Sequence, residues 1–576
     1  MTSRPRQPRA FAAALACAAF KSPLTLTLAL TLTLSAARSL AAQTQAPPAP
    51  GPVPPRADAA TFDPLGARID PHVAKPRLIV LTDIANEPDD QMSLVRLLVY
   101  SNQFDIEGLV ATTSRHLRKG PRPDVIRTVL GAYAKVQPNL LKHEPGFPEA
   151  AVLSNLVVAG QDGYGMESVG PGKTTEGAEL IVKAAVSSDP RPLWVTVWGG
   201  ANTLAQALWY ARSTRPAADV ERIVSKLRVY TISDQDDAGP WLRREFPMLH
   251  YIATPGDHVD YHVATWTGLA GDEFYRNAPG ADWTTVSEAW LNEHVRNKGP
   301  LGAYYPLPCC MIEGDTPSFL SLIDNGLAAY MNPSFGGWGG RYVWRQPWLE
   351  TRPYWTNSRA SRDTVTGVDG KPYTSDQATI WRWRTAYMHD FAARMAWTVS
   401  GVAEANHNPD VVVNGVKGKA PLAIDAKAGT PITLDAAGSS DRDRHALRYQ
   451  WFFYPEAGTG IPSSTGGGAP ATPTAPPAPT THPAPTAGST GAASAQGSAS
   501  STSKPGGPAL VSAIAPQPAG GRPTPRPRVT LTNGETSSVA TVMPNTPGIA
   551  HVILAVTDDG TPSLTSYRRI ILTIQP

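Results

Sequence analysis

A cluster of acidic residues follows the first strongly apolar stretch after the N-terminal region. Four carboxylates fall within eight positions, at Asp83, Glu87, Asp89 and Asp90. Like charges this close repel one another, and a hard divalent cation with oxygen ligands is the simplest way to offset them. Asp89 and Asp90 could instead stand in the first turn of a helix, where the helix dipole favours carboxylates. That alternative explains only two of the acids, so the segment predicts a metal or catalytic site.

A second polar segment follows another apolar stretch and consists of Asp234, Gln235, Asp236 and Asp237. If that stretch is a strand ending at the same sheet edge as Asp83, these side chains could contact sugar hydroxyls. The alternative is a cap on the helix that is expected to start near residue 240. Both interpretations stay open, with Gln235 and Asp236 as the candidate substrate ligands.

Tryptophan is concentrated in one region of the chain. Seven of the 15 tryptophans lie between positions 338 and 397. Flat aromatic faces stack on sugar rings, although packing in a core is expected for at least half of the group. Trp338 is flanked by two glycine pairs, which let a ligand approach the backbone closely, so it is predicted to bind substrate.

The residues around these candidates alternate between strand and helix patterns. Strands are predicted at 77–82, 106–112, 193–198, 227–232 and 248–253, and helices at 90–101, 123–136, 174–187 and 202–212. The alternation indicates an open, mostly parallel α/β sheet of the Rossmann-like type. In such a sheet, ligands bind where strands end, which is where Asp83 lies.

Composition divides the chain into segments. Residues 1–42 have a positive start, an apolar run and small residues, which predict an export signal; an uncleaved anchor helix is the alternative. Residues 43–75 are rich in Pro and Ala and are expected to be a flexible linker. The α/β domain is expected at 76–404 and an all-β, immunoglobulin-like sandwich at 408–576. An insertion at 458–528 lacks the apolar residues needed to fold, so we expect disorder there.

Charge and cysteine content exclude several classes of protein. The formal net charge of +3 is close to balance, so nothing indicates a nucleic-acid partner. After signal cleavage only Cys309 and Cys310 remain, which excludes a fold held together by disulfides. No later stretch is long and apolar enough to predict membrane insertion. A secreted or periplasmic location is therefore expected.

The order strand, Asp, loop, Asp-Asp and helix resembles the start of the nucleoside hydrolases. From about residue 76 onward, the chain more closely resembles a family of secreted bacterial cellulose-binding proteins. These join a nucleoside-hydrolase-like domain to an immunoglobulin-like C-terminal domain. The further segments that carry the resemblance are 235–241 (QDDAGPW), 313–318 (EGDTPS) and 336–340 (GGWGG).

The resemblance implies a role for each matching residue. Asp83 would ligate Ca²⁺ and act as a general base toward water. Asp90 would be a bidentate Ca²⁺ ligand, and the backbone carbonyl of Ala201 and the carboxylate of Asp315 would complete the site. Asp89 would hydrogen-bond a sugar hydroxyl.

The acidic loop also departs from the nucleoside hydrolases. It carries Asn86, Glu87 and Pro88, is longer, and lacks their glycine, while Leu81 stands where their motif opens with Asp. No histidine clearly matches the one that assists the departing base in some of those enzymes. Glu313 is the alternative acid, and Asn86 and Glu313 join the candidate substrate-binding residues.

Two functions follow from these residues and the resemblance. The first is a Ca²⁺-dependent hydrolase of N-glycosyl or related glycosidic bonds, in which a metal activates water that attacks an anomeric carbon. Its substrate would be a carbohydrate or a nucleoside-like small molecule. The second is a non-catalytic protein that binds a cellulose-like polysaccharide and retains the metal site. A further possibility assigns adhesion to the β domain alone.

Overall fold

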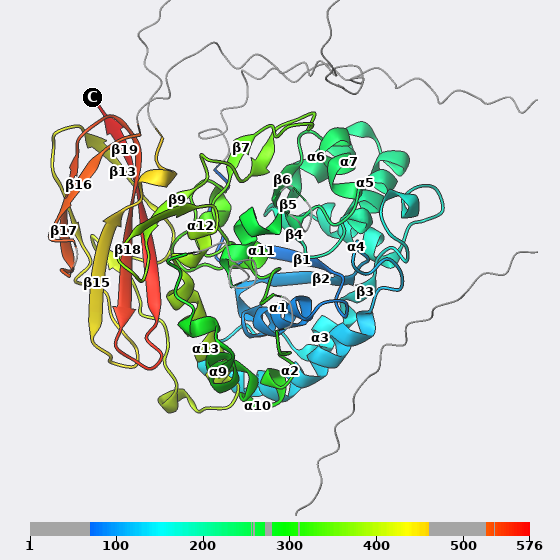
Figure 1. Cartoon of the computed structure of the whole chain (residues 1–576), viewed down its shortest axis with the longest axis horizontal. Coiled ribbons are helices and arrows are strands. Elements are labelled where there is room, and N and C mark those ends of the chain that lie inside the picture. The colour runs from blue at the N-terminus through cyan, green and yellow to red at the C-terminus, as the bar shows by residue number, and fades with distance from the viewer. Residues whose placement is uncertain are drawn as a thin grey trace, which may run out of the picture. The chain divides into compact units, whose positions relative to one another are not determined.

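An eight-stranded sheet forms the centre of the N-terminal part of the chain in this computed structural model, which describes residues 69–254, 256, 260–270, 279–308, 311–459, 526–534 and 536–576. Within the described residues, all neighbouring strands of this sheet are parallel except β7 and β8. Figure 1 shows β1 beside β2 near the centre of this part of the chain. In spatial order the strands are β3 (Val157–Ala159), β2 (Asp105–Ala111), β1 (Arg77–Thr82), β4 (Leu193–Val197), β5 (Leu227–Ser233), β6 (His250–Thr254), β8 (Tyr354–Thr356) and β7 (Val343–Arg345).

The sequence of β1 explains its central place in the sheet. All six of its residues are buried. Leu78 and Val80 pack into one hydrophobic core, whereas Ile79 and Leu81 pack into another. Successive side chains of a strand point to opposite faces, so a continuous apolar run fits a strand that is covered on both sides.

Helices cover both faces of the sheet. Residues of α1, α2 and α13 belong to the first core, and residues of α4 to α7 belong to the second. The described helices are α1 (Pro88–Val99), α2 (Pro123–His143), α3 (Ala150–Asn155), α4 (Glu176–Ala185), α5 (Asn202–Thr214), α6 (Ala217–Lys226), α7 (Ala238–Glu245), α9 (Glu288–Leu291), α10 (Gly299–Gly302), α11 (Pro317–Leu320), α12 (Ala378–Trp381) and α13 (Arg384–Trp397). Within the described ranges, none of these helices has the length and apolarity that a membrane crossing requires.

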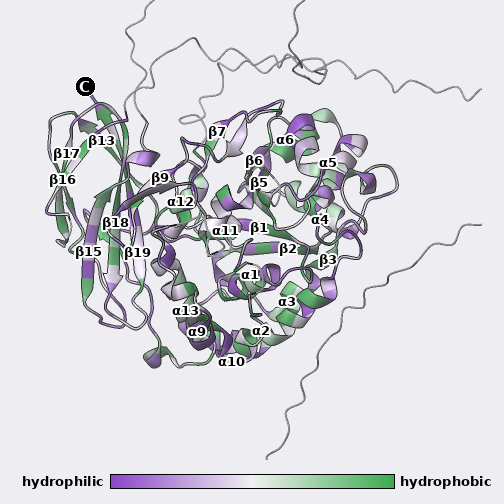
Figure 2. Cartoon of the chain, viewed as in Figure 1, coloured by the Kyte–Doolittle hydropathy of each residue, from purple (hydrophilic) through white to green (hydrophobic). Residues whose placement is uncertain are grey.

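The C-terminal part is a β-sandwich with its own core, which includes Trp451 at 2 % exposure. The alternation of buried and partly exposed residues along β17 is typical of a strand with one face in the core. Figure 2 shows the corresponding mixture of hydrophobic and hydrophilic residues along these strands. One sheet contains β13 (Leu422–Lys427), β19 (Thr565–Gln575), β18 (Gly548–Asp558) and β15 (Leu447–Phe453), and the other contains β14 (Ile432–Asp435), β17 (Val539–Pro544) and β16 (Val529–Thr532).

Two short hairpins complete the described structure, and side-chain contacts join the sandwich to the α/β part. The hairpins are β9 (Asp363–Thr366) with β10 (Pro372–Ser375), and β11 (Val412–Val413) with β12 (Val416–Lys417). Buried Arg569 of β19 donates hydrogen bonds to the carbonyl of Leu327 at 2.6 Å and to that of Gly336 at 2.8 Å. The sandwich is thus tied to the segment that follows Asp315.

The observed architecture confirms the predicted fold class, an open and mostly parallel α/β sheet followed by an all-β part. Several other predictions concern residues that the structure does not describe. The export signal at 1–42, most of the linker at 43–75, all but the ends of the insertion at 458–528, and the pair Cys309–Cys310 lie outside the described residues.

Candidate metal and substrate site

The candidate site lies where the strand order of the sheet changes direction. β1 pairs with β2 on one side and with β4 on the other. Asp83 follows β1, and Gly199 follows β4 after a single intervening residue. Crevices at the carboxyl ends of such strands are the usual ligand sites of open α/β sheets.

Asp83 is held between the ends of these strands. Its side chain is buried, and the Ser114 hydroxyl donates a hydrogen bond to Oδ2. A Cβ atom added at Gly199 would lie 2.5 Å from Asp83 Oδ1. Only glycine therefore allows the β4 loop to approach Asp83 this closely, which explains the residue type at 199.

The first turn of α1 supplies two further carboxylates, Asp89 and Asp90. They are each 4 % exposed and stand at the helix end whose dipole favours negative charge. The Thr82 hydroxyl donates a hydrogen bond to Asp90 Oδ1. Glu87 is the N-cap residue, but its side chain makes no capping hydrogen bond. Asp89 and Asp90 thus lie in the first turn of a helix, as the alternative interpretation predicted. The helix dipole accounts for these two carboxylates and not for the nearby Asp83 and Glu87.

The fourth carboxylate, Asp315, comes from a distant part of the sequence and is 2 % exposed. Glu313 fixes the position of this segment. Its backbone is left-handed, with φ at 51°, and its carboxylate forms an ion pair with Arg96 of α1, in which Nε and Oε2 are 2.5 Å apart. A Cβ atom on Gly314 would lie 2.7 Å from Asp89 Oδ2. The segment around Asp315 therefore packs directly against the start of α1.

Asp89, Asp90 and Asp315 converge on one place. Each offers a carboxylate oxygen, and these oxygens all lie within 4.8 Å of one another. Asp89 Oδ1 and Asp315 Oδ2 are buried and have no hydrogen-bond partner. Buried polar atoms without partners are rare and costly, and oxygen-only donors suit Ca²⁺. The residues present therefore fit a hard divalent cation.

The acid–base properties of the cluster reflect its burial. Burial raises the pKa of Asp89 to about 8, and the charges of Glu87 and Asp83 add to the rise. Burial, followed by the neighbouring carboxylates, also raises the pKa values of Asp90 and Asp315 well above the ordinary range. Asp83 likewise has a raised pKa because it is buried, although its hydrogen bond from Ser114 opposes the rise. Without a cation, the cluster therefore holds protons at neutral pH.

This electrostatic state predicts a pH dependence for cation binding. A cation must displace protons from the cluster, so its affinity should rise with pH, by about tenfold per pH unit for each proton displaced. Isothermal titration calorimetry with Ca²⁺ at several values between about pH 6 and pH 9 measures this slope. An affinity that does not change across the range would contradict the assignment.

The stability of the cation-free chain should follow the opposite trend. The folded-state pKa of Asp89, about 8, exceeds its ordinary value of 3.8, so its contribution is complete below about pH 4 and is lost as the pH rises through about 8. In a chelator, the thermal midpoint should fall over this window, and Ca²⁺ should reverse the loss. The Asp90→Asn chain, with one acid fewer, is the matched control and should show a smaller fall.

Two other predicted residues lie in the segments that follow β4 and β1. Ala201 is the N-cap residue of α5, and its carbonyl accepts the N–H of Ala205 at 3.0 Å. A carbonyl oxygen has a second lone pair, so its role as a cation ligand stays a prediction. Asn86 is exposed in the loop before α1, and its contact with substrate also stays a prediction.

Two side chains of the polar segment after β5 form hydrogen bonds with backbone groups of neighbouring loops and helices. The two carboxylate oxygens of Asp236 accept the backbone N–H groups of Asn202 and Ala238, each at 3.0 Å, which joins the N-terminal ends of α5 and α7. These bonds fit the alternative interpretation of Asp236 as a helix cap, and its contact with substrate stays a prediction. Gln235 Nε2 donates to the carbonyl of Trp198 at 2.6 Å, so substrate binding by Gln235 stays a prediction.

Glu313 is neither an open acid nor a substrate ligand, which corrects its predicted role. It is fully buried, pairs with Arg96, and accepts hydrogen bonds from the hydroxyls of Tyr305 (2.8 Å) and Thr316 (2.9 Å). These partners occupy both carboxylate oxygens. Its part is to position the segment that carries Asp315.

Trp338 is also a core residue rather than an open stacking surface. It is 1 % exposed, and its ring contacts Tyr387 and Tyr567. The flanking glycines let the chain pack tightly: a Cβ atom on Gly339 would lie 2.3 Å from the carbonyl oxygen of Pro317. In the same group of tryptophans, Trp348 is 76 % exposed and presents its ring to solvent.

Sequence reasoning missed the residues that support the acids. Thr82 and Ser114 donate to Asp90 and Asp83, and Arg96 neutralises Glu313. His116 lies close enough to Asp83 for its charge to oppose the raised pKa of that residue. The polar run at 112–116 follows β2 at the same sheet edge as Asp83, and this was the available signal for Ser114 and His116.

Comparison with known families matches both parts of the chain. The family described as "Cellulose-binding Sde182, nucleoside hydrolase-like domain" matches residues 77–342. The family described as "Cellulose-binding protein Sde0182, C-terminal domain" matches residues 498–574. The first match contains Asp83, Asp89, Asp90 and Asp315. No curated protein matches the chain.

One solved structure is similar over most of the chain. It is a nucleoside hydrolase-related hypothetical protein from Saccharophagus degradans that is associated with carbohydrate metabolism, with 33 % identity and a TM-score of 0.65, covering 87 % of this chain and 100 % of that chain. The type III effector protein XopQ, solved in complex with adenosine diphosphate ribose, has 12 % identity and a TM-score of 0.28, covering 57 % of this chain and 96 % of that chain. This second similarity is too low to indicate a shared function.

Proposed function

Because the chain belongs to the family of cellulose-binding proteins with a nucleoside-hydrolase-like domain, we propose that it is a cation-dependent hydrolase of a glycosidic bond in a carbohydrate substrate. The observation that carries the proposal is the convergence of Asp89, Asp90 and Asp315, whose carboxylate oxygens lie within 4.8 Å of one another at the ligand-binding edge of the sheet. The bond would be N-glycosyl or a related type. Export by the segment 1–42 is part of the proposal, since it would bring the protein to polysaccharide.

The chemistry divides between the cation and the chain. When bound, a hard divalent cation such as Ca²⁺ would supply positive charge that activates water and fixes sugar hydroxyls. Asp89, Asp90 and Asp315 would hold it, and the Ala201 carbonyl is a further candidate ligand. Two carboxylate oxygens without hydrogen-bond partners, Asp89 Oδ1 and Asp315 Oδ2, support this assignment.

Asp83 is the residue proposed as the general base. The Ser114 hydroxyl occupies Oδ2, which leaves Oδ1, beside Gly199, to take a proton from water. A raised pKa makes a carboxylate a better proton acceptor near neutral pH than an exposed one. Water that loses its proton to Asp83 would attack the anomeric carbon as the bond between that carbon and the leaving group breaks. The leaving group would depart with the bonding electrons and take a proton from solvent.

A hydrolysis assay tests this proposal. The full chain with Ca²⁺ should release sugar from a panel of nucleosides, aryl glycosides and β-linked oligosaccharides. Asp83→Asn should lower the rate by about 100-fold to 10,000-fold, the usual contribution of a positioned base, while Ca²⁺ affinity falls much less than the rate. Unchanged turnover in Asp83→Asn would remove Asp83 as the base.

A second candidate function is binding of polysaccharide without turnover. Two observations favour it: Glu313 is fully paired and cannot serve as the leaving-group acid, and Trp348 presents an exposed ring for stacking on a sugar. In this case the panel gives no product, the chain sediments with cellulose, and Trp348→Ala weakens the sedimentation. Leu349→Ala, at a neighbour that is 84 % exposed, is the matched control.

A further inference from the structure

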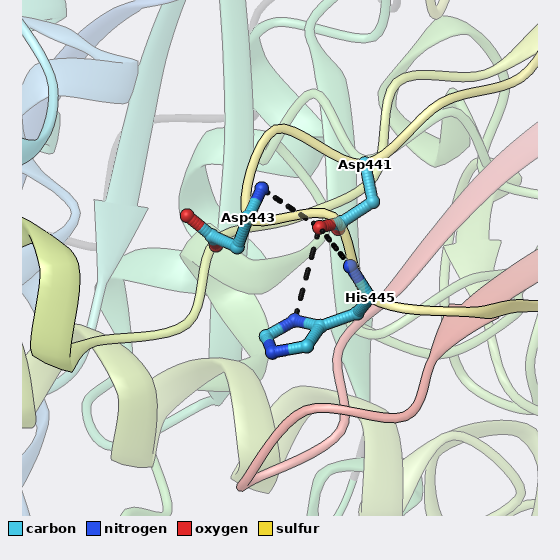
Figure 3. A group of neighbouring side chains, drawn as sticks. All are labelled: Asp441, Asp443 and His445. Carbon is cyan, nitrogen blue, oxygen red and sulfur yellow. Dashed lines mark hydrogen bonds and ion pairs between the residues drawn. The ribbon is translucent and has the colours of Figure 1, made fainter.

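A second group of metal-ligating side chains lies in the sandwich, far along the chain from the first. The loop between β14 and β15 carries Asp441, Asp443 and His445 at alternating positions. Each offers one ligand atom, and these atoms all lie within 4.8 Å of one another. Figure 3 shows the Asp441 carboxylate facing the His445 ring, with the backbone nitrogen of Asp443 directed at the same carboxylate. The intervening Arg442 and Arg444 are exposed.

The loop backbone itself holds the cluster together. Asp441 Oδ1 accepts the backbone N–H of Asp443 at 2.8 Å and that of His445 at 3.1 Å (Figure 3). The ring Nδ1 of His445 lies 3.7 Å from the same oxygen. These bonds account for Oδ1 of Asp441 and leave its other oxygen unused.

The unused oxygen is the observation that indicates a ligand. The Asp441 side chain is 1 % exposed, and its Oδ2 has no hydrogen-bond partner. His445 Nδ1 is also buried without a hydrogen bond. Two polar atoms without hydrogen-bond partners in one cluster, Asp441 Oδ2 and His445 Nδ1, are a cost that a cation would remove.

We propose that Asp441, Asp443 and His445 bind a divalent cation of the Zn²⁺ class. Two carboxylates and one imidazole form a mixed oxygen and nitrogen donor set, and imidazole suits Zn²⁺ and related metals, whereas Ca²⁺ takes oxygen ligands. This donor set differs from the all-carboxylate cluster at Asp89, Asp90 and Asp315. The two sites therefore select different ions.

The surroundings of Asp443 indicate what the cation would do. The backbone N–H of His407 donates to Asp443 Oδ2 at 2.8 Å, and the His407 ring Nδ1 lies 2.9 Å from the same oxygen. The His407 ring in turn stacks on Trp397 of α13. Outer partners of this kind orient a metal ligand. A cation here would brace the loop of the sandwich against the end of α13.

Calorimetric titration of the full chain with Zn²⁺ tests the site. The Asp90→Asn chain serves as the parent, so that the first cluster does not dominate the signal. Replacing a ligand should weaken binding to this parent by at least about 10-fold to 100-fold, the loss known for outer partners alone. Asp441→Asn keeps an oxygen for the two backbone N–H groups, and His445→Gln removes a ring that is 34 % exposed and has no hydrogen bond from Nδ1.

His294→Gln is the matched control, since its side chain is 27 % exposed and lies in the α/β part. It should bind Zn²⁺ as the parent does. The proposal is overturned if the parent binds no Zn²⁺, if both loop variants bind as tightly as the parent, or if His294→Gln weakens binding equally. It is also overturned if Ca²⁺ displaces Zn²⁺ from the parent at equal concentration. None of these results depends on hydrolysis, so they are separate from the proposed function.

Discussion

Replacing Asp315 by asparagine is expected to abolish tight cation binding and, with it, hydrolysis. The variant keeps the size of the side chain and removes one of the three converging carboxylates. Loss of an outer partner alone costs about 10-fold to 100-fold in metal affinity, so loss of a direct ligand should cost at least about 100-fold. Calorimetric titration with Ca²⁺ and the sugar-release assay measure the two effects on the same preparation.

The stability of this variant separates the loss of a ligand from a failure to fold. Asp315 has a pKa raised by burial and by three neighbouring aspartates, so its ionised form is unfavourable in the cation-free protein. Asparagine removes that cost, and the cation-free variant should be at least as stable as the parent near pH 8. Asp324→Asn is the matched control, because Asp324 is buried on the same segment but bonds to His72 at 3.1 Å. A normal Ca²⁺ affinity in Asp315→Asn would contradict the assignment.

Replacing Arg96 by methionine is expected to produce the largest loss of stability. Arg96 and Glu313 are both fully buried, and removing one partner leaves an uncompensated charge in the core, which costs about 3–5 kcal/mol. Arg96 also stacks over the ring of Phe391, with its guanidinium carbon 3.9 Å from the ring centroid. Equilibrium unfolding in guanidinium chloride measures the change in free energy of unfolding.

Two further variants make the Arg96 experiment decisive. The double variant Arg96→Met/Glu313→Gln removes both charges and should recover part of the lost stability. Arg222→Met breaks a pair with Asp219 on the surface of α6, where the Arg222 side chain is 59 % exposed, and should cost only about 0–1 kcal/mol. Because Glu313 positions Asp315, the single variant should also bind Ca²⁺ more weakly. A change below about 1 kcal/mol for Arg96→Met would show that the buried pair does not hold the segment.

The parts of the fold that follow local patterns were predictable from sequence. The run 77–82 matches β1 because a strand buried on both faces must be apolar throughout. The helix starting near 123 was expected to end at 136, before Pro138, yet α2 continues to His143. Buried Leu140 and His143 hold the last turns against the core, so packing overrides the local effect of the proline.

The candidate site was predictable only where residue types and strand ends coincide. Asp83, Asp89 and Asp90 are close in sequence, and the family resemblance added Asp315. The resemblance placed Asp83 at the cation and Asp89 on a sugar hydroxyl, whereas the oxygens that converge belong to Asp89, Asp90 and Asp315. Glu313 is buried and paired because of Arg96, which lies 217 positions away in the sequence. The burial of Trp338 depended on contacts with Tyr387 and Tyr567. Such long-range partners leave no signal in the residues around Glu313 or Trp338.

A crystal structure of the full chain grown with Ca²⁺ tests the central claim most directly. Anomalous scattering should reveal an ion among Asp89, Asp90 and Asp315, with carboxylate oxygens at about 2.3–2.6 Å. The Asp315→Asn variant under the same conditions should show no ion at this place. Carboxylates that remain without an ion at saturating Ca²⁺, or an ion held by other residues, would contradict the claim that this cluster is the cation site.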